Sequence, residues 1–208
     1  MTRPPILWKL AQALVRIFTT LLFDLKVYGR RNVPPTGGVL LVTNHESYLD
    51  PALIGAQLWR PISYLAKSEL FENRFFGWLI SNLYAFPVRQ GAGDVGAMRE
   101  TIRRLQEGHL LNIFPEGSRT ETGEMLPIES GVALVIRRAG VPVVPVVIDG
   151  SYEAWPKGRK LPRAHPIRVV YGPPMELTGH KSAEIVQTID ATLRRMLKEL
   201  HARSDMRH

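Results

Sequence analysis

The chain has 208 residues, enough for one domain with a full hydrophobic core. Its 27 lysines and arginines against 19 aspartates and glutamates give a formal net charge of +8, which suits anionic partners such as nucleic acid, an acidic membrane surface or phosphorylated ligands. It contains no cysteine, which excludes disulfides, thiolate metal sites and a cysteine nucleophile.

Residues 6–25 are rich in leucine, isoleucine, valine and phenylalanine, yet Lys9, Arg16 and Asp24 interrupt them. The longest uncharged piece is much shorter than the about 20 residues that cross a bilayer, and there is no small-residue cleavage site, so we expect neither a membrane span nor a signal peptide. The apolar residues recur at helical spacing, which predicts an amphipathic helix. That helix would either lie at a membrane interface, with Trp8 at the headgroup level, or pack against the core.

A short apolar run, residues 39–42, is led in by glycines and closed by polar residues, as in a buried strand. His45 follows its end, and Asp50 comes five residues later. A histidine just past the C-terminal end of a buried strand lies where open α/β sheets place their ligands. Asp50 would accept the second imidazole N–H and fix the tautomer of a general base. Alternatively, Asp50 caps a helix beginning at Pro51, and His45 is an ordinary loop residue.

Beyond this loop, predicted helices and strands alternate to the end of the chain. Prolines 142 and 145 favour an edge or irregular position for the strand that contains them. The pattern predicts an α/β fold, a single-domain sandwich with a mostly parallel central sheet covered by helices, preceded by the N-terminal amphipathic helical segment. Strands are expected at 62–66, 84–88, 109–114, 141–148 and 167–171, and helices at 51–58, 70–83, after Asp94, at 130–139 and at 182–201.

Two further predicted strand ends carry polar residues that would share a rim with His45. Residues 114–120 read Phe-Pro-Glu-Gly-Ser-Arg-Thr, in which Gly117 lets the backbone approach a ligand and Arg119 offers a planar fork for phosphate or carboxylate oxygens. Arg89 follows another strand. Together they suggest a site for an anionic substrate beside a base. The plainer alternative is a surface turn with a Glu–Arg pair.

Four segments resemble, in order and spacing, the motifs of the glycerophospholipid acyltransferases. Residues 44–50, Asn-His-Glu-Ser-Tyr-Leu-Asp, resemble the first motif, His-x4-Asp. Residues 86–89 resemble the second motif, which ends in arginine, and residues 114–120 resemble the third, usually Glu-Gly-Thr-Arg-Ser. Residues 141–146, Val-Pro-Val-Val-Pro-Val, resemble the fourth. The resemblance covers about residues 25–175.

The resemblance implies an acyltransferase domain over residues 29–208, preceded by a membrane-associating amphipathic helix in residues 1–28. The implied reaction moves a fatty acyl chain from acyl-CoA or acyl carrier protein to the free hydroxyl of a lysophospholipid. In the usual family member the acceptor is 1-acylglycerol-3-phosphate and the product is phosphatidate. The implied location is peripheral or monotopic, on an anionic membrane surface at the cytoplasmic face of the cell membrane. No cofactor and no metal are expected.

The same resemblance implies roles for the site residues. His45 would deprotonate the attacking hydroxyl and then protonate the leaving thiolate, with Asp50 holding it, so that no acyl-enzyme is needed. A non-catalytic lipid-binding module of the same fold is an alternative, and the intact histidine and aspartate count against it. A nucleic-acid binder is suggested only by charge, and its usual motifs are missing. The substrate-binding residues implied by the motifs are Arg89, Glu116, Gly117, Ser118 and Arg119.

One position departs from the family pattern. After the third motif the family often reads Leu-Pro-Phe-Lys-x-Gly, whose lysine is taken to help bind the phosphate of the acceptor. Here residues 126–131 read Leu-Pro-Ile-Glu-Ser-Gly, with Glu129 in place of the lysine. The departure leaves the acceptor open, with an amino-acid lysolipid as an alternative, and leaves the chemistry unchanged.

Overall fold

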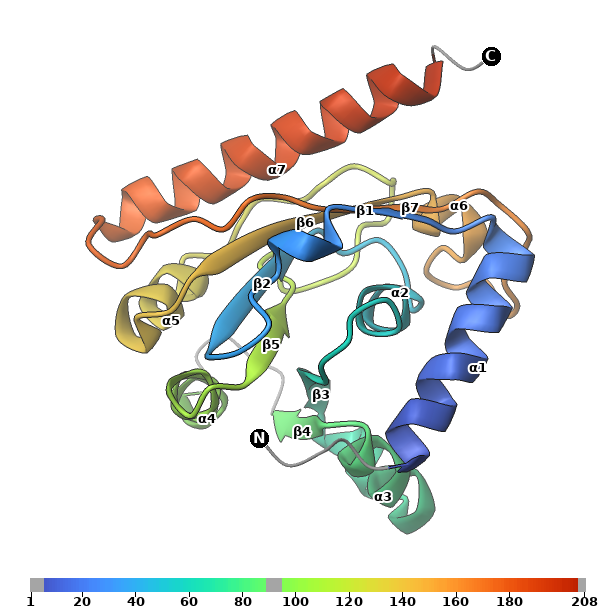
Figure 1. Ribbon diagram of the computed structural model, residues 1–208, viewed down its shortest axis with the longest axis horizontal. Coiled ribbons are helices and arrows are strands. Elements are labelled where there is room, and N and C mark those ends of the chain that lie inside the picture. Colours follow the sequence, from blue (N-terminus) through green and yellow to red (C-terminus); the bar gives the residue numbers. More distant parts are fainter. Residues whose placement is uncertain (1–5, 89–94, 206–208) are drawn as a thin grey trace.

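The computed structural model describes residues 6–88 and 95–205, and in these ranges seven strands form one sheet in the order β1–β7–β6–β2–β5–β3–β4 (Figure 1). Neighbouring strands run parallel, except β6 and β7, which are antiparallel. The predicted α/β class with a mostly parallel sheet is therefore confirmed. The strands are β1 (Lys26–Tyr28), β2 (Val39–Thr43), β3 (Ile62–Lys67), β4 (Ala85–Val88), β5 (Leu110–Ile113), β6 (Val143–Asp149) and β7 (Arg168–Tyr171).

Helices cover both faces of the sheet. One hydrophobic cluster joins the sheet to α4, α5 and α7, and a second joins its other face to α2, α6 and the end of α1 (Figure 1). The helices are α1 (Ile6–Phe23), α2 (Asp50–Gly55), α3 (Arg74–Asn82), α4 (Val95–Gln106), α5 (Gly131–Ala139), α6 (Ser151–Ala154) and α7 (Ser182–Asp205), with 3-10 turns η1 (Arg30–Asn32) and η2 (Ser68–Phe71).

Strand β2 lies in the middle of the sheet, between β5 and β6. Its residues are all fully buried, and they alternate between the two hydrophobic clusters: Leu40 and Val42 pack in one, Val39 and Leu41 in the other. A strand buried on both faces reads as a continuous apolar run, which is why it was recognisable in the sequence. Its C-terminal end opens at the centre of the sheet, beside the ends of β5 and β6.

The expected edge position of the strand with two prolines is wrong, because β6 pairs with β2 on one side and with β7 on the other. The Val143 N–H donates to Met175 O on the β7 side, so Pro145, two residues on, also turns its nitrogen to that side. Strand β7 ends at Tyr171, opposite Val146, and Pro145 only accepts a hydrogen bond from the Gly172 N–H. Proline cannot return a hydrogen bond to Gly172 O, so the ladder between β6 and β7 lacks this bond at the end of β7, while the pairing of β6 with β2 is unaffected.

The other predicted elements are present with shifted ends. The expected helix at 70–83 is divided into η2 and α3, because the side chain of Asn73 caps α3 by accepting a hydrogen bond from the Phe76 N–H at 3.0 Å. The short elements β1, η1 and α6 were not predicted. Each has only three or four residues, too few to show a hydrophobic period.

Helix α1 presents one apolar stripe to the outside. Its polar side attaches to the end of α2, where Gln12 donates to Leu58 O and Arg16 to Ala56 O. Trp8, which the membrane-interface interpretation placed at the headgroup level, faces the protein and is 9% exposed. The packing of this helix thus differs from both sequence interpretations in part: its apolar stripe is outward, but its tryptophan is not. The stripe comprises Ile6, Leu10, Leu14, Ile17, Phe18 and Leu21, which are 49–82% exposed.

Within the described ranges, no helix combines the length and the apolar character needed to cross a membrane. Helix α1 has 18 residues and carries Lys9 and Arg16.

Candidate active site

The loop after β2 brings His45 and Asp50 together, as the spacing predicts. His45 Nδ1 lies 2.8 Å from Asp50 Oδ2, and the Asp50 carboxylate is fully buried. Asp50 does not cap α2: the cap position is Leu49, and the carboxylate turns back to accept hydrogen bonds from the N–H groups of Glu46 (2.7 Å) and Ser47 (2.8 Å). The capping alternative is therefore excluded.

Hydrogen-bond donors surround Asp50 on both oxygens. Oδ2 faces the imidazole and the two backbone N–H groups, and Oδ1 accepts a hydrogen bond from Ser151 Oγ at 2.7 Å. All of these contacts suit a carboxylate, which only accepts hydrogen bonds. The ionised carboxylate in turn places the imidazole proton on Nδ1 and leaves the lone pair on Nε2.

The loop after β5 fixes the position of His45. Glu116 Oε1 accepts a hydrogen bond from the His45 N–H at 2.7 Å, and the Thr120 N–H donates to His45 O at 3.0 Å. The Phe114 ring stacks on the imidazole, with centroids 3.8 Å apart and planes 15° from parallel. The His45 side chain is 18% exposed, and among the described residues no hydrogen-bond partner lies at Nε2. The backbone, the ring face and Nδ1 of His45 are thus all held in place, and Nε2, the nitrogen that can take a proton, is open.

Glu116 is buried between the two loops. Its second oxygen, Oε2, accepts a hydrogen bond from the Leu126 N–H at 2.6 Å, so both oxygens bind backbone donors. Burial raises the pKa of Glu116 to about 7, against the opposing effect of these two N–H groups. In this structure Glu116 joins the His45 backbone to the segment that leads to Glu129.

The remaining residues of this loop lie at the surface beside the histidine. Gly117 has φ +69°, a left-handed conformation, and Gly117 and Ser118 are exposed. Arg119 is half-buried, with its guanidinium carbon 3.4 Å from the centroid of the Tyr48 ring. Its Nη1 is buried and finds no hydrogen-bond partner within the described part of the chain. Arg89, expected at the same rim, lies outside the described residues.

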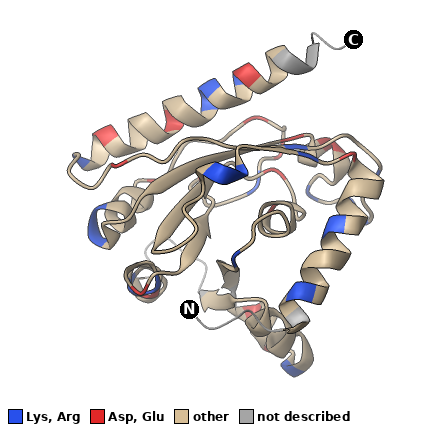
Figure 2. Ribbon diagram, in the orientation of Figure 1, with Lys and Arg blue, Asp and Glu red and all other residues tan. Residues whose placement is uncertain are grey.

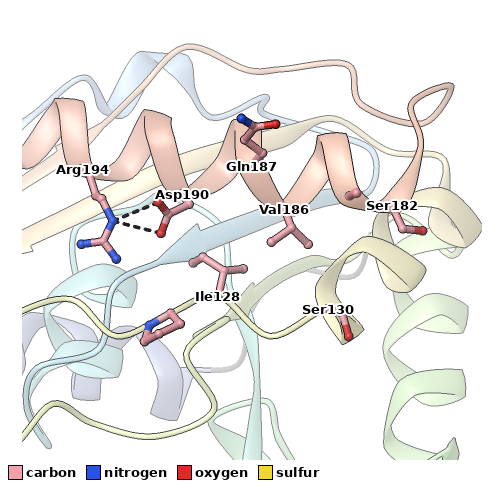
Figure 3. A pocket seen from close by; sticks show the side chains of 9 residues that line it. Ile128, Ser130, Ser182, Val186, Gln187, Asp190 and Arg194 are labelled. Atoms are coloured by element: carbon pink, nitrogen blue, oxygen red, sulfur yellow. Dashed lines mark hydrogen bonds and ion pairs between the residues drawn. The ribbon is translucent and has the colours of Figure 1, made fainter.

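Glu129 lies against the same loop. Its backbone N–H donates to Pro115 O at 2.8 Å, and a methyl group added to Gly117 would overlap its carboxylate. The neighbouring residues Pro127, Ile128 and Ser130 instead line an open groove of about 650 Å³ beneath α7 (Figure 3). Glu129 does not line this groove. Glu129 is exposed, and its carboxylate sits beside Gly117.

Three residues that the sequence pattern does not predict complete the site. Asn44 joins the loop to β6, because its side chain accepts from the Ile148 N–H (2.8 Å) and donates to Ile148 O (2.9 Å). Glu46 and Ser151 are buried beside Asp50. Ser151 follows the end of β6 at the same rim as His45, and that position was the only signal of its role available in the sequence.

Comparison with known proteins agrees with the class that this fold and this histidine–aspartate pair define. Residues 24–149 match the family model described as Acyltransferase. This match covers more than half of the chain, and the chain belongs to the Acyltransferase family. It is an enzyme of acyl transfer, as the His-x4-Asp resemblance implied.

Particular relatives are similar over most of the chain. The 1-acyl-sn-glycerol-3-phosphate acyltransferase of Bacillus subtilis is 26% identical over 203 residues, covering 96% of this chain and 99% of the relative. The crystal structure of PlsC, the 1-acyl-sn-glycerophosphate acyltransferase of Thermotoga maritima, aligns with a TM-score of 0.81 at 28% identity, covering 93% of this chain and 79% of that one. A lyso-ornithine lipid O-acyltransferase of Pseudomonas aeruginosa is 32% identical over 144 residues, covering 69% of this chain and 54% of the relative, so the chain spans about half of its length.

The raised pKa of Glu116 predicts a pH-dependent contribution to stability. The folded pKa of about 7 lies above the ordinary 4.5, so the contribution is complete below about pH 4.5 and is lost as the pH rises through about 7. The loss should amount to roughly 3 kcal/mol. The test measures the free energy of unfolding in urea from pH 5 to pH 8. We expect the value for the wild type to fall relative to the value for Glu116→Gln as the pH rises. A difference that is constant, or that favours the wild type more at high pH, would contradict the raised pKa.

Proposed function

We propose that the enzyme transfers a fatty acyl chain from an acyl thioester to the free hydroxyl of 1-acylglycerol-3-phosphate and so forms phosphatidate. The observation that carries the proposal is His45, held by a buried Asp50 and open at Nε2. The near full-length similarity to the B. subtilis 1-acyl-sn-glycerol-3-phosphate acyltransferase supports the choice of acceptor. The donor is acyl-CoA or acyl carrier protein.

In the proposed reaction, His45 Nε2 takes the proton of the acceptor hydroxyl as its oxygen attacks the thioester carbonyl. The tetrahedral intermediate collapses with cleavage of the carbon–sulfur bond, and the imidazolium returns the proton to the leaving thiolate. The Asp50 carboxylate holds Nδ1–H and stabilises the positive ring between these steps. One histidine therefore serves both half-steps, with no net change in its protonation.

The serines near His45 do not support an acyl-enzyme route. Ser47 is fully buried, and its hydroxyl donates to Trp155 O at 2.7 Å, so its hydrogen is held by that carbonyl and not by the imidazole. Ser118 is exposed in a turn without the Gly-x-Ser-x-Gly elbow that presents a nucleophilic serine. Direct attack by the acceptor hydroxyl is the simpler route.

We assign the acceptor headgroup to the exposed part of the loop after β5. Arg119, whose Nη1 has no hydrogen-bond partner among the described residues, would bind the phosphate, with Arg89 assisting and Gly117 and Ser118 lining the approach. Glu116 would support this site by holding the loop, since both of its oxygens are occupied.

Residues 1–28 are proposed to hold the enzyme peripherally on an anionic membrane surface, at the cytoplasmic face. The outward apolar stripe of α1 is one support. The other is the segment 155–172, which has no acidic residue and carries five lysines and arginines. This segment meets the end of α1, where the Ile167 N–H donates to Phe23 O at 2.8 Å. Figure 2 shows blue positions on both elements.

A second candidate acceptor is a lysolipid with an amino-acid headgroup. Two observations favour it: a carboxylate, Glu129, lies beside the proposed phosphate site, and one relative is a lyso-ornithine lipid O-acyltransferase. A carboxylate there would repel a phosphate dianion and attract an ammonium group.

Replacing His45 with alanine should lower kcat by about two to four decades, the usual contribution of a positioned base. Asp50→Asn should also lower kcat strongly, because the imidazole loses its anionic partner. The assay is steady-state acyl transfer to lysophosphatidate, with circular dichroism to verify folding. His180→Ala, which changes an exposed histidine before α7, is the matched control. Near wild-type turnover by folded His45→Ala would refute the proposed chemistry.

The double substitution Leu14→Glu and Leu21→Glu should release the enzyme from membranes, because it places two charges on the outward stripe of α1. We expect the fraction that floats with phosphatidylglycerol vesicles to fall several-fold, and high salt to weaken binding of the wild type. Leu134→Glu, at an exposed leucine of α5, controls for the loss of any surface leucine. Equal flotation of the double variant and the wild type would place the membrane contact elsewhere.

Substituting Glu129 with lysine should change the choice of acceptor. We expect the ratio of kcat/KM for lysophosphatidate to that for lyso-ornithine lipid to rise by roughly tenfold, since a repulsive charge becomes attractive. Glu124→Lys makes the same charge change at an exposed position five residues earlier and should leave the ratio unchanged. If both variants act alike, or neither has an effect, Glu129 has no role in acceptor selection.

A further inference from the structure

A second buried carboxyl group lies behind the catalytic pair and has no part in the proposed reaction. Glu46 is 8% exposed, and Ser151 is fully buried. The Ser151 hydroxyl oxygen is 2.7 Å from Asp50 Oδ1 and 3.1 Å from Glu46 Oε2. One hydroxyl group therefore bridges two carboxyl groups inside the protein.

The hydrogen atoms of this bridge can be assigned by counting donors. A serine hydroxyl has one hydrogen, so it can donate to only one of the two carboxyl groups at a time. Glu46 Oε1 accepts a hydrogen bond from Asn44 Nδ2 at 3.0 Å. Oε2 faces the Ser151 oxygen and accepts the Tyr152 N–H at 3.2 Å. An O–H group at Oε2 satisfies every one of these contacts.

The charges around Glu46 also favour its neutral form. Burial raises its pKa well above the ordinary value, and the charge of Asp50 raises it further. Asp149, at the end of β6, has the same effect and is itself paired with His201 of α7. From the loop after β5, Glu116 adds a third carboxyl group near Asp50.

We propose that Glu46 and Ser151 are positioning residues for the base: neutral Glu46 donates from Oε2 to Ser151 Oγ, and Ser151 donates to Asp50 Oδ1. Given the proposed role of His45, the chain of hydrogen bonds runs Glu46–Ser151–Asp50–His45 and ends at Nδ1. It sets the plane of the Asp50 carboxylate so that Oδ2 faces the imidazole. Neither residue touches substrate.

The neutral state of Glu46 has a function in this scheme. A second negative charge behind Asp50 would make the imidazole more basic. The imidazolium would then be slower to return its proton to the leaving thiolate, because the driving force for that transfer would fall. A neutral carboxyl group supplies a hydrogen-bond donor to the serine without adding this charge.

The first test is Ser151→Ala. It should lower kcat by about ten- to hundredfold, the effect of losing a hydrogen bond to a charged group, with little change in KM. The Asp50 carboxylate loses a hydrogen-bond donor and therefore stabilises the positive imidazolium more strongly. The acid limb of the pH–rate profile should move to higher pH as a result. Ser63→Ala, at a buried serine of β3, should change neither quantity. Unchanged kcat and an unmoved acid limb in folded Ser151→Ala would overturn the proposal.

The second test, Glu46→Gln, decides the charge of Glu46 even if Ser151→Ala fails to fold. The glutamine amide can donate to Ser151 as the carboxyl O–H does, but its nitrogen cannot accept the Tyr152 N–H, so we expect some loss of kcat and, as the deciding result, an unmoved acid limb. If Glu46 is ionised in the wild type, the substitution removes a negative charge and the acid limb moves to lower pH, which would overturn the proposal. His45→Ala serves as the reference in the same assay. If His45→Ala is inactive and the Glu46→Gln profile is shifted, only this inference is refuted. If His45→Ala retains turnover, the proposed function is refuted.

Discussion

A buried carboxylate is stable only if hydrogen-bond donors of the protein replace the water that it has lost. The arrangement of the active site depends on meeting this requirement at Asp50. Its donors come from its own loop, from the imidazole, and from Ser151 at the end of another strand. No single loop supplies all of them. The carboxylate is therefore stable only where the ends of β2 and β6 meet, and the parallel arrangement of these strands brings their ends to the same rim.

Strand β2 lies between β5 and β6, and the residues that follow these two neighbours have different roles at the site. The β6 side holds the loop rigidly, through Asn44 and Ser151. The β5 side brackets the His45 backbone through Glu116 and Thr120, and then continues into exposed residues. In the proposed reaction, proton transfer thus depends on buried contacts and acceptor choice on exposed ones. If Glu129 selects the acceptor as proposed, it can differ from the family pattern without disturbing the chemistry.

The sequence predicts those features that leave a local pattern. The buried run of β2 and the spacing of His45 and Asp50 are of this kind, and the fold class follows from alternating helices and strands. Ser151 and Glu46 leave no such pattern, because their meaning arises only when two distant loops touch. The apolar period of α1 shows that the helix has an apolar side but does not tell which side faces the protein. The prolines of β6 were misleading because only the sheet itself shows where β7 stops.

Helix α1 has a consequence for how the reaction would be measured. In the proposed arrangement its apolar stripe rests in the bilayer surface, and the acceptor and the product both stay in that plane. The enzyme would then meet its acceptor by lateral diffusion in two dimensions. Its rate would follow the mole fraction of the lysolipid among the surrounding lipids, not the amount of lysolipid per volume of solution. Diluting the surface with inert lipid would slow the enzyme while every bulk concentration of acceptor and enzyme stayed the same.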